Sequence, residues 1–201
     1  FKVAAVYADK INSDVDIILQ NLNYENYRLV YFISENEVVF SNNASSLYKI
    51  KPIDVKLTYK AFVDDIIESN DCNNLVNVVN YSLMPANNDL IELAFQSGIY
   101  SRFKRDNDFA PNCYFSLYRI WLEKSLNRNI ADEVFAYTEN SKILGFITIV
   151  KCKDYGKIGL IAVAQEARGK NIGRKLILSG AKYLSDSKIN TFYVATQNEN
   201  H

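Results

Sequence analysis

A cluster of positive side chains and glycines at residues 168–175 is the part of this sequence most able to bind a ligand. The stretch 168–173 is Arg-Gly-Lys-Asn-Ile-Gly, and Arg174 and Lys175 follow it. Such a concentration of guanidinium and ammonium groups can hold more than one phosphate, while glycine allows a ligand to approach the backbone closely. The pattern favours a pyrophosphate-bearing ligand. The alternative left open is the solvated first turn of an ordinary helix.

The residues around this cluster predict a strand before it and a helix after it. Residues 157–163 form a continuous apolar run rich in β-branched residues, typical of a strand covered on both faces. From Ile172 onward apolar residues recur at helical spacing, and a further strand is predicted at 191–196. A helix start leaves N–H groups without intrahelical partners and carries partial positive charge, so it favours an anion. The stretch 157–196 is therefore predicted to be a phosphate-binding strand–helix–strand unit.

Spacing and residue counts exclude several other kinds of site. Neither G-x-x-x-x-G-K-[ST] nor a G-x-G-x-x-G after a strand occurs, which argues against a P-loop NTPase and a Rossmann enzyme. The sole histidine is His201, so a histidine-dependent triad is not expected. Three cysteines at wide spacings argue against a disulfide framework and a structural zinc site. We expect free thiols and no metal.

The composition indicates a globular protein whose net charge creates no strong electrostatic field. The formal net charge is zero and 48% of residues are hydrophobic, so no global attraction to nucleic acid or to an anionic membrane is expected. No apolar run approaches the ~20 residues of a membrane span, and the sequence start lacks the layout of a signal peptide. The sequence therefore predicts a cytoplasmic protein with no nucleic-acid partner and no membrane insertion.

A second candidate region combines aromatic and basic residues after a predicted helix over 85–98. Tyr100, Arg102 and Phe103 lie in a segment that a cleft-lining loop would suit. Tyr118 and Trp121 share one side of the next predicted helix. Aromatic stripes at helical spacing usually face the core, so packing is the competing interpretation. From the residues alone, packing is favoured.

The phosphate-binding unit resembles the acetyl-CoA signature of the GNAT superfamily of N-acetyltransferases, R/Q-x-x-G-x-G/A between the fourth strand and the third helix. Arg168 and Gly173 match its ends, whereas its middle glycine is Asn171 here. Asparagine tolerates left-handed backbone angles better than most residues. Two antiparallel strands predicted at 133–138 and 143–150 precede the unit, in the order that a GNAT core needs.

From about Leu90 to its end the chain resembles one GNAT branch, the acetyltransferases similar to TDP-fucosamine (dTDP-4-amino-4,6-dideoxygalactose) acetyltransferase. The matching motifs are Leu93-Ala94, Gly98, Tyr100-Ser101-Arg102-Phe103, Asp106, Phe109, Leu117-Tyr118, Trp121, Ser125, residues 131–134, 145–148 and 158–163, Thr196-Gln197 and Asn200. The resemblance implies an α/β GNAT fold with a mixed, mostly antiparallel sheet flanked by helices. It also implies acetyl-CoA as co-substrate and N-acetylation of a nucleotide-linked amino sugar in surface-polysaccharide (lipopolysaccharide) biosynthesis.

The same resemblance assigns expected sites. Expected contacts to the cofactor are Ile161, Ala162, Val163, Arg168, Gly169, Lys170, Asn171, Ile172, Gly173, Arg174 and Asn200. Expected contacts to the acceptor are Tyr100, Arg102, Phe103, Tyr118 and Trp121. The catalytic acid is expected to be a tyrosine beyond His201, and no general base is singled out. Asp132 and Glu133 are carboxylates near the expected cleft, although a solvated strand entry explains them as well.

Two domains are expected: residues 1–88 as a reduced GNAT-like α/β half, and 89–201 as the acetyltransferase domain. That domain is expected to be truncated, because the strand at 191–196 would leave an apolar open edge. A homodimer is left open. The alternative functions are acetylation of another small amine or of a peptide N-terminus, or non-catalytic binding of acyl-CoA.

Overall fold

The computed structural model describes residues 2–7, 14–36, 38–69 and 75–200, which form two compact units, Phe1–Pro52 and Ile53–His201. The division therefore falls earlier than the expected boundary between residues 88 and 89. The reason is that residues 56–62 and 78–80 are strands of the larger unit's sheet. The two units are described separately.

The described residues of the first unit form two parallel strands and two α-helices. Strand β1 (Lys2–Tyr7) pairs in parallel with β2 (Tyr27–Ile33), and helix α1 (Val15–Tyr24) connects them. Helix α2 (Asn42–Leu47) follows and is capped by the Ser41 side chain. A parallel pair needs a crossover connection of this kind. The kinship of this unit to a GNAT half stays a prediction.

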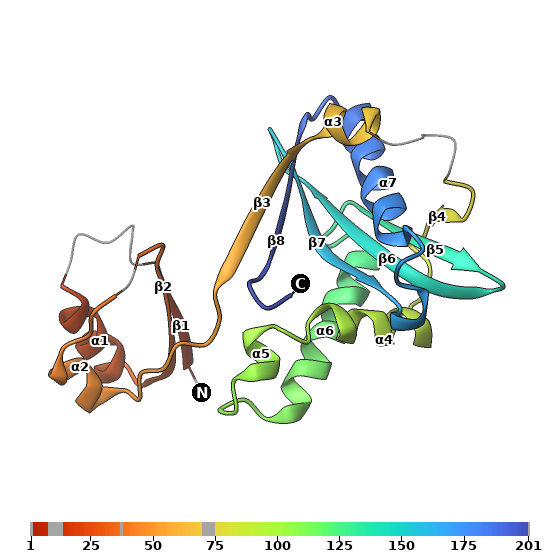
Figure 1. Ribbon diagram of the computed structural model, residues 1–201. Coiled ribbons are helices and arrows are strands. Elements are labelled where there is room, and N and C mark those ends of the chain that lie inside the picture. Colours follow the sequence, from red (N-terminus) through yellow and green to blue (C-terminus); the bar gives the residue numbers. More distant parts are fainter. Residues whose placement is uncertain (1, 8–13, 37, 70–74, 201) are drawn as a thin grey trace. The chain divides into compact units, whose positions relative to one another are not determined.

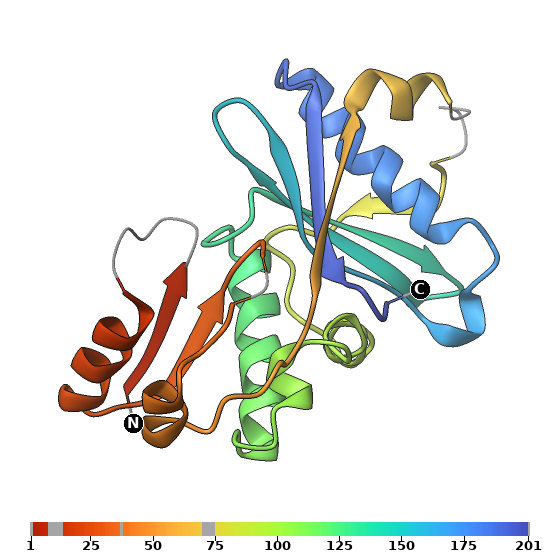
Figure 2. The same cartoon turned by 60° about the vertical axis from the view of Figure 1, so that its left-hand side comes forward.

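The second unit is built on a six-stranded sheet in the order β3-β8-β7-β6-β5-β4 (Figures 1 and 2). Every neighbouring pair is antiparallel except β7 and β8, which are parallel. The strands are β3 (Lys56–Phe62), β4 (Val78–Asn80), β5 (Glu133–Glu139), β6 (Lys142–Lys151), β7 (Gly156–Val163) and β8 (Thr191–Gln197). The predicted mixed, mostly antiparallel sheet is confirmed.

Helices cover both faces of this sheet. Helix α7 (Ile172–Asp186) packs on β5, β6 and β7, and α4 (Asn88–Ser97) packs on β6 and β7. Gly145 of β6 brings the α7 side chains Ile172 and Leu176 close to the sheet, where a Cβ would lie 3.1 Å from each. The other helical segments among the described residues of this unit are α3 (Val63–Glu68), α5 (Arg102–Arg105), α6 (Pro111–Leu126) and a 3₁₀ turn (Gln165–Ala167).

The expectation that β8 has an open edge is wrong. Strand β3 pairs antiparallel with β8 along its whole length, from Lys56 opposite Gln197 to Phe62 opposite Thr191, and runs beside it in both views (Figures 1 and 2). The alternating residues of β3 predict a strand, but they do not say which strand is its partner. Lys56 and Lys60 lie on this outermost strand, where lysine discourages pairing with another chain.

Other sequence expectations concern cysteines and membrane spans. Cys113 and Cys152 are free thiols, whereas Cys72 lies outside the described residues. Among the helices of the described chain, none has the length and apolar character needed to cross a membrane.

Candidate functional site

The central feature of the larger unit is the separation of β7 from β8. The two strands pair only at Gly156, Lys157 and Ile158 of β7, although both continue further. On its other side β7 remains paired with β6 through Val163. The second half of β7 therefore has one edge that β8 does not occupy.

A bulge between β6 and β7 accompanies this separation. The register shifts between Ile147 and Ile149, where the Thr148 side chain is buried and its Oγ1 accepts a 2.8 Å hydrogen bond from the Leu160 N–H. Gly159 makes room for this contact, because a Cβ there would lie 2.7 Å from Thr148 Oγ1. Bulges bend a strand and increase its twist, which accounts for the divergence of β7 from β8.

The free edge of β7 offers backbone hydrogen-bonding groups. The N–H of Leu160 points to Thr148 of β6, and the N–H of Ala164 donates to the Leu144 carbonyl at 2.8 Å. Because backbone groups alternate sides along a strand, those of Ile161 and Val163 point away from β6, toward the space left by β8. An extended ligand could pair there as an added strand would.

A pocket of about 330 Å³ opens beside this edge. Its lining comes from the end of α4, from β7, from the loop before α7 and from the segment after β8: Gln96, Ser97, Ile99, Tyr100, Ile161, Ala162, Val163, Arg168 and Asn200. Six of these residues are predicted site residues, so the fold brings together positions far apart in the sequence. Gln96, Ser97 and Ile99 were not predicted, because the last turn of a helix and the residues just after it carry no distinguishing pattern.

The predicted helix start lies beyond β7. Asn171 is the N-cap of α7 and has left-handed angles (φ 59°, ψ 17°), while Gly169 has φ 77°. Within the described chain no side chain caps this helix at Asn171. The Arg168 Nε donates to the Val163 carbonyl at 3.4 Å, which connects the loop to the edge of β7. A helix start of this kind leaves backbone N–H groups that favour an anion.

Gly173 has space beside it. A Cβ at this position would meet only Val163 Cγ2, at 3.8 Å, an ordinary contact distance. Its φ is not among the positive values of the described residues. Glycine inside a helix costs roughly 0.5–1 kcal/mol relative to alanine. Neither the backbone conformation nor the packing of this chain requires glycine here.

The four cations of the cluster differ in their surroundings. Arg168 and Lys170 are exposed. Arg174 donates to the Ser69 carbonyl at the end of α3 at 2.5 Å, and Lys175 Nζ lies 5.4 Å from the centre of the Tyr137 ring. The Ile172 side chain is buried in the core. Arg174 thus also has a structural contact, and Ile172 can offer a ligand only its backbone.

The predicted acceptor residues form two groups: one lines the pocket, and the others pack behind it. Tyr100 lines the pocket. Tyr118 is buried beneath Gly98, its ring 5.7 Å from that of Trp121. Phe103 packs against Phe109, with ring centroids 5.7 Å apart, and the Arg102 guanidinium carbon lies 4.8 Å from the Phe103 ring centre.

Burial raises the pKa of the Tyr118 phenol, while the nearby Ser101 hydroxyl and Arg102 guanidinium oppose this shift. A neutral, buried phenol suits a packing role. Tyr118, Trp121 and Phe103 therefore support the wall that carries Tyr100, and their side chains are not among those that line the pocket.

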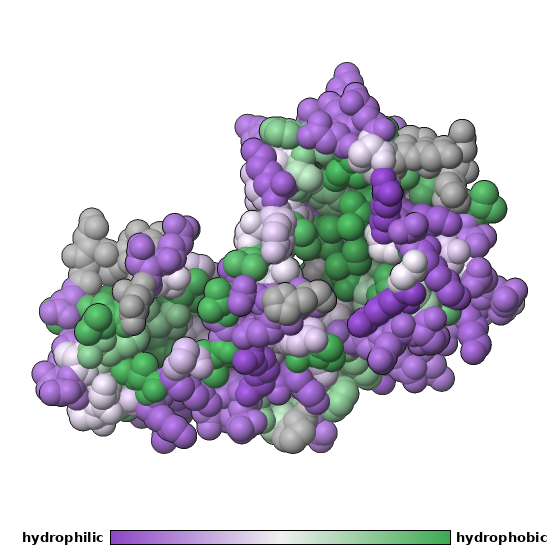
Figure 3. Space-filling model, viewed as in Figure 1, coloured by the Kyte–Doolittle hydropathy of each residue, from purple (hydrophilic) through white to green (hydrophobic). Residues whose placement is uncertain are grey.

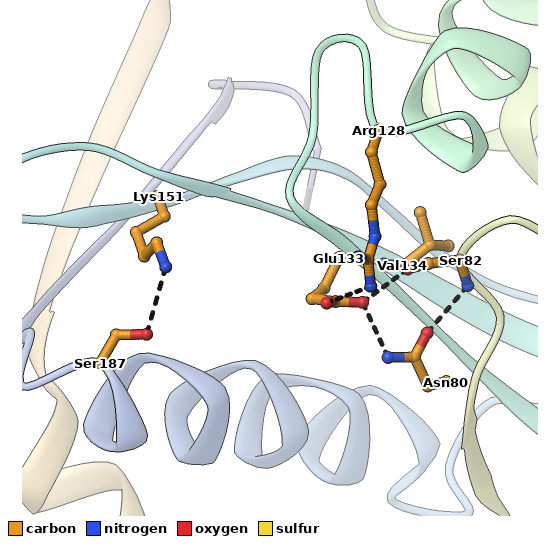
Figure 4. A network of polar contacts seen from close by, with 7 residues as sticks. All are labelled: Asn80, Ser82, Arg128, Glu133, Val134, Lys151 and Ser187. Carbon is orange, nitrogen blue, oxygen red and sulfur yellow. Dashed lines mark hydrogen bonds and ion pairs between the residues drawn. The ribbon is translucent and has the colours of Figure 1, made fainter.

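The carboxylate of Glu133 belongs to a separate polar network (Figure 4). It accepts hydrogen bonds from Asn80 Nδ2 and Ser82 Oγ, both at 2.7 Å, and from the Arg128 guanidinium at 2.5 Å. Burial alone would raise the pKa of this carboxyl, but these three donors outweigh it and lower the pKa below its ordinary value of 4.5. Glu133 is thus a buried structural anion, rather than the solvated residue that was expected.

Asp132 also has a structural contact, because its Oδ2 accepts the Lys151 N–H at 2.6 Å. Neither Asp132 nor Glu133 lines the pocket. In the space-filling view apolar residues gather on the sheet surface seen between β8 and α7, and hydrophilic residues border them (Figure 3). Exposed apolar surface of this kind is common where ligands or partners bind.

Comparison with known proteins agrees with this architecture. The sequence profile described as the acetyltransferase (GNAT) family matches residues 97–201. Among curated proteins, no sequence matches significantly. A conserved protein of unknown function from Staphylococcus epidermidis is similar in structure, with a TM-score of 0.57 and 16% identity over 92% of this chain and 69% of that chain.

A tandem GNAT protein from the clavulanic acid biosynthesis pathway is also similar, with a TM-score of 0.50 and 13% identity over 83% of this chain and 54% of that chain. At these identities the two likenesses establish the fold. The family profile covers more than half of the sequence and includes the separated strands and the start of α7. The chain therefore belongs to the GNAT family of acetyltransferases.

Proposed function

We propose that this chain is an acetyl-CoA-dependent N-acetyltransferase that acetylates the amine of a small acceptor. The observation that carries the proposal is the free edge of β7, which leads from the pocket to an uncapped helix start bordered by Arg168 and Lys170. An elongated ligand with a pyrophosphate at one end and amides along its length fits this arrangement. Coenzyme A has these features.

Gly173 supports the placement of the pyrophosphate. Because the chain itself does not need glycine there, close approach of a ligand to the helix start explains the residue best. The phosphates would bind the backbone of Gly169, Lys170, Asn171, Ile172 and Gly173, with Arg168 beside them. Arg174 would contribute charge while it keeps its bond to Ser69.

The pantetheine arm would pair with the backbone of Ile161, Ala162 and Val163 in the manner of an added strand. This places the thioester carbonyl near outward-pointing N–H groups, which would stabilise the charge that develops on its oxygen. Asn200 lies at the same pocket and forms the opposite wall of the proposed cofactor site.

The chemistry would be direct attack by the neutral amine. Its nitrogen forms a bond to the thioester carbon, the carbon–sulfur bond breaks, the amine loses a proton and the departing thiolate gains one. Among the described residues, those that line the pocket include no carboxylate and no histidine, and we propose that water accepts the proton from the amine. The tyrosine acid expected beyond His201 stays a prediction.

The proposed acceptor is a nucleotide-linked amino sugar used in surface-polysaccharide synthesis. Support comes from charge: Arg168 is the only charged residue that lines the pocket, so the described lining has no anion to attract a polyamine or a basic peptide. The nearby cations also have contacts within the chain, including Arg102, whose guanidinium lies over the Phe103 ring. Arg105 pairs with Glu199 at 2.9 Å, and Lys104 lies over the Tyr114 and Phe115 rings. Arg102 is the cation of this wall that we propose for the acceptor's phosphates.

The test is release of free coenzyme A thiol from acetyl-CoA in the presence of different amines. The panel contains dTDP-linked amino sugars, the corresponding free amino sugars, spermidine and a short peptide with a free N-terminus. We expect the highest kcat/KM for a nucleotide-linked sugar. A preference for spermidine or the peptide would contradict the proposed acceptor. Binding of acetyl-CoA without release of coenzyme A for any amine would instead indicate a non-catalytic acyl-CoA-binding module.

A further inference from the structure

The side chain of Gln96 presents a buried acceptor at the pocket. Its Oε1 is inaccessible to solvent and has no hydrogen-bond partner among the described residues. Gln96 lies in the last turn of α4 and lines the pocket together with Ile161 and Val163. A buried carbonyl oxygen without a donor destabilises a protein. The presence of such an oxygen at a pocket is therefore best explained by a ligand that donates a hydrogen bond to it.

The backbone that carries Gln96 is well supported. The Gly98 N–H donates to the Phe95 carbonyl at 3.1 Å, and the Tyr114 hydroxyl donates to the same carbonyl. The Tyr118 ring fills the space where a Cβ of Gly98 would be. These contacts fix the last turn of α4 against α6, so the chain presents Gln96 from a rigid element, as a binding residue requires.

The free edge of β7 supplies backbone acceptors to the same pocket. Along the free edge of β7 the carbonyls of Ile161 and Val163 point outward, and the Val163 carbonyl also accepts a 3.4 Å hydrogen bond from Arg168 Nε. A pantetheine arm has two amide N–H groups. The Ile161 carbonyl can accept one of them, and the Gln96 oxygen, which has no partner among the described residues, can accept the other.

On the basis of the proposed function, we infer that Gln96 is a further binding residue that accepts a hydrogen bond from an amide N–H of the pantetheine arm. The arm would then lie between β7 and α4, and the Gln96 side chain would turn its covered oxygen into the pocket to accept the hydrogen bond. A side-chain amide takes up no proton near neutral pH, so Gln96 positions the arm and is not the base for the amine.

The variant Gln96→Met tests this role, because methionine is similar in size and cannot accept a strong hydrogen bond. The variant Gln20→Met is the matched control, since Gln20 is exposed on α1. Each protein is titrated by calorimetry with acetyl-CoA and with adenosine 3′,5′-bisphosphate, which lacks the pantetheine arm. Thermal unfolding of the free proteins is measured in parallel.

We expect Gln96→Met to bind acetyl-CoA roughly 5- to 20-fold more weakly, and to bind the bisphosphate as the parent chain does. Its Tm without ligand should be equal or higher, because the orphaned oxygen is gone. A residue needed only for structure would instead lower Tm.

Unchanged affinity of Gln96→Met for acetyl-CoA would overturn the inference alone. Equal losses for both ligands would also overturn it, because the bisphosphate cannot reach the pantetheine subsite. Failure of the unmodified chain to bind acetyl-CoA would overturn the proposed function, and this inference with it. The parent titration therefore separates the two cases.

Discussion

At the start of α7, the asparagine at position 171 and the glycine at position 173 are explained by different causes. Asn171 adopts left-handed angles, which the asparagine side chain tolerates but does not need. Gly173 is ordinary in its backbone and has room beside it. The first residue is explained by the turn that begins the helix. For the second, we propose that a ligand approaches the helix start closely at this position.

Replacement of Gly173 tests this explanation. Gly173→Val should abolish acetyl-CoA binding, because its side chain would occupy the space left for the pyrophosphate, while Val163 is far enough away for the fold to survive. Calorimetry measures affinity, and circular dichroism checks folding. Ser185→Val, at an exposed position of the same helix, controls for the lower helix propensity of valine. A Gly173→Val variant with parental affinity would show that the pyrophosphate site is wrongly assigned.

Asn171→Gly should keep or increase acetyl-CoA affinity and stabilise the free protein by ~1 kcal/mol at most, since it relieves a left-handed angle. Asn140→Gly is the matched control, because Asn140 has φ 50° in the turn between β5 and β6. It should change Tm similarly and leave affinity unchanged. A tenfold loss of affinity in Asn171→Gly alone would show instead that the asparagine side chain contacts the ligand.

At the scale of elements, the Glu133 network joins β4, β5 and the end of α6. Its carboxylate bonds to Asn80 in β4 and to Arg128 just after α6, and the Ser82 hydroxyl accepts the Val134 N–H at 2.8 Å (Figure 4). Hydrogen bonds to charged groups contribute more to stability than neutral ones. The network thus stabilises the far edge of the sheet, away from the diverging strands.

Glu133→Gln should destabilise the protein by about 2 kcal/mol at neutral pH, because it removes the charge that three donors share. The lowered pKa of Glu133 means that this contribution is complete above its ordinary value of 4.5 and is lost as pH falls through the folded-state value. The difference from the parent should therefore shrink in acid. Urea unfolding at several pH values measures it, with exposed Glu123→Gln as control. A difference independent of pH would rule out the charge as the cause.

The elements that the sequence predicts well are those whose signals are local. The run 157–163, the basic turn and the helical spacing after Ile172 identify β7 and α7, because each signal lies within one element. The pairing of β3 with β8 was missed, since its partner is distant in sequence and no residue of β3 specifies it. Gln96 was missed for a related reason: its role depends on what α4 packs against.

At the scale of the whole molecule, the segment 53–80 belongs to the larger unit. Val63 of α3 is fully buried, and its N–H donates to the Asn190 carbonyl at 3.1 Å. Strand β3 covers β8, and the Arg174 bond to Ser69 ties the end of α3 to α7. We therefore propose that the acetyltransferase domain begins near Ile53, rather than at residue 89.

Two fragments distinguish these boundaries. The fragment 53–201 keeps β3, α3 and β4, so it should be monomeric, unfold cooperatively and bind acetyl-CoA as the whole chain does. The fragment 89–201 lacks all three elements and uncovers the β8 edge, including the buried Phe192. An apolar strand edge without cover pairs with other chains, so this fragment should associate or fail to unfold cooperatively.

Size-exclusion chromatography and thermal denaturation compare the two fragments at the same concentration. The whole chain with Thr58→Pro serves as an intermediate case, because proline inside β3 removes a backbone donor while every other element remains. We expect its stability to fall between those of the two fragments. If the 89–201 fragment is monomeric and has the same Tm as the 53–201 fragment, then β3 does not stabilise the sheet. In that case β8 can form the outermost strand without β3 beside it.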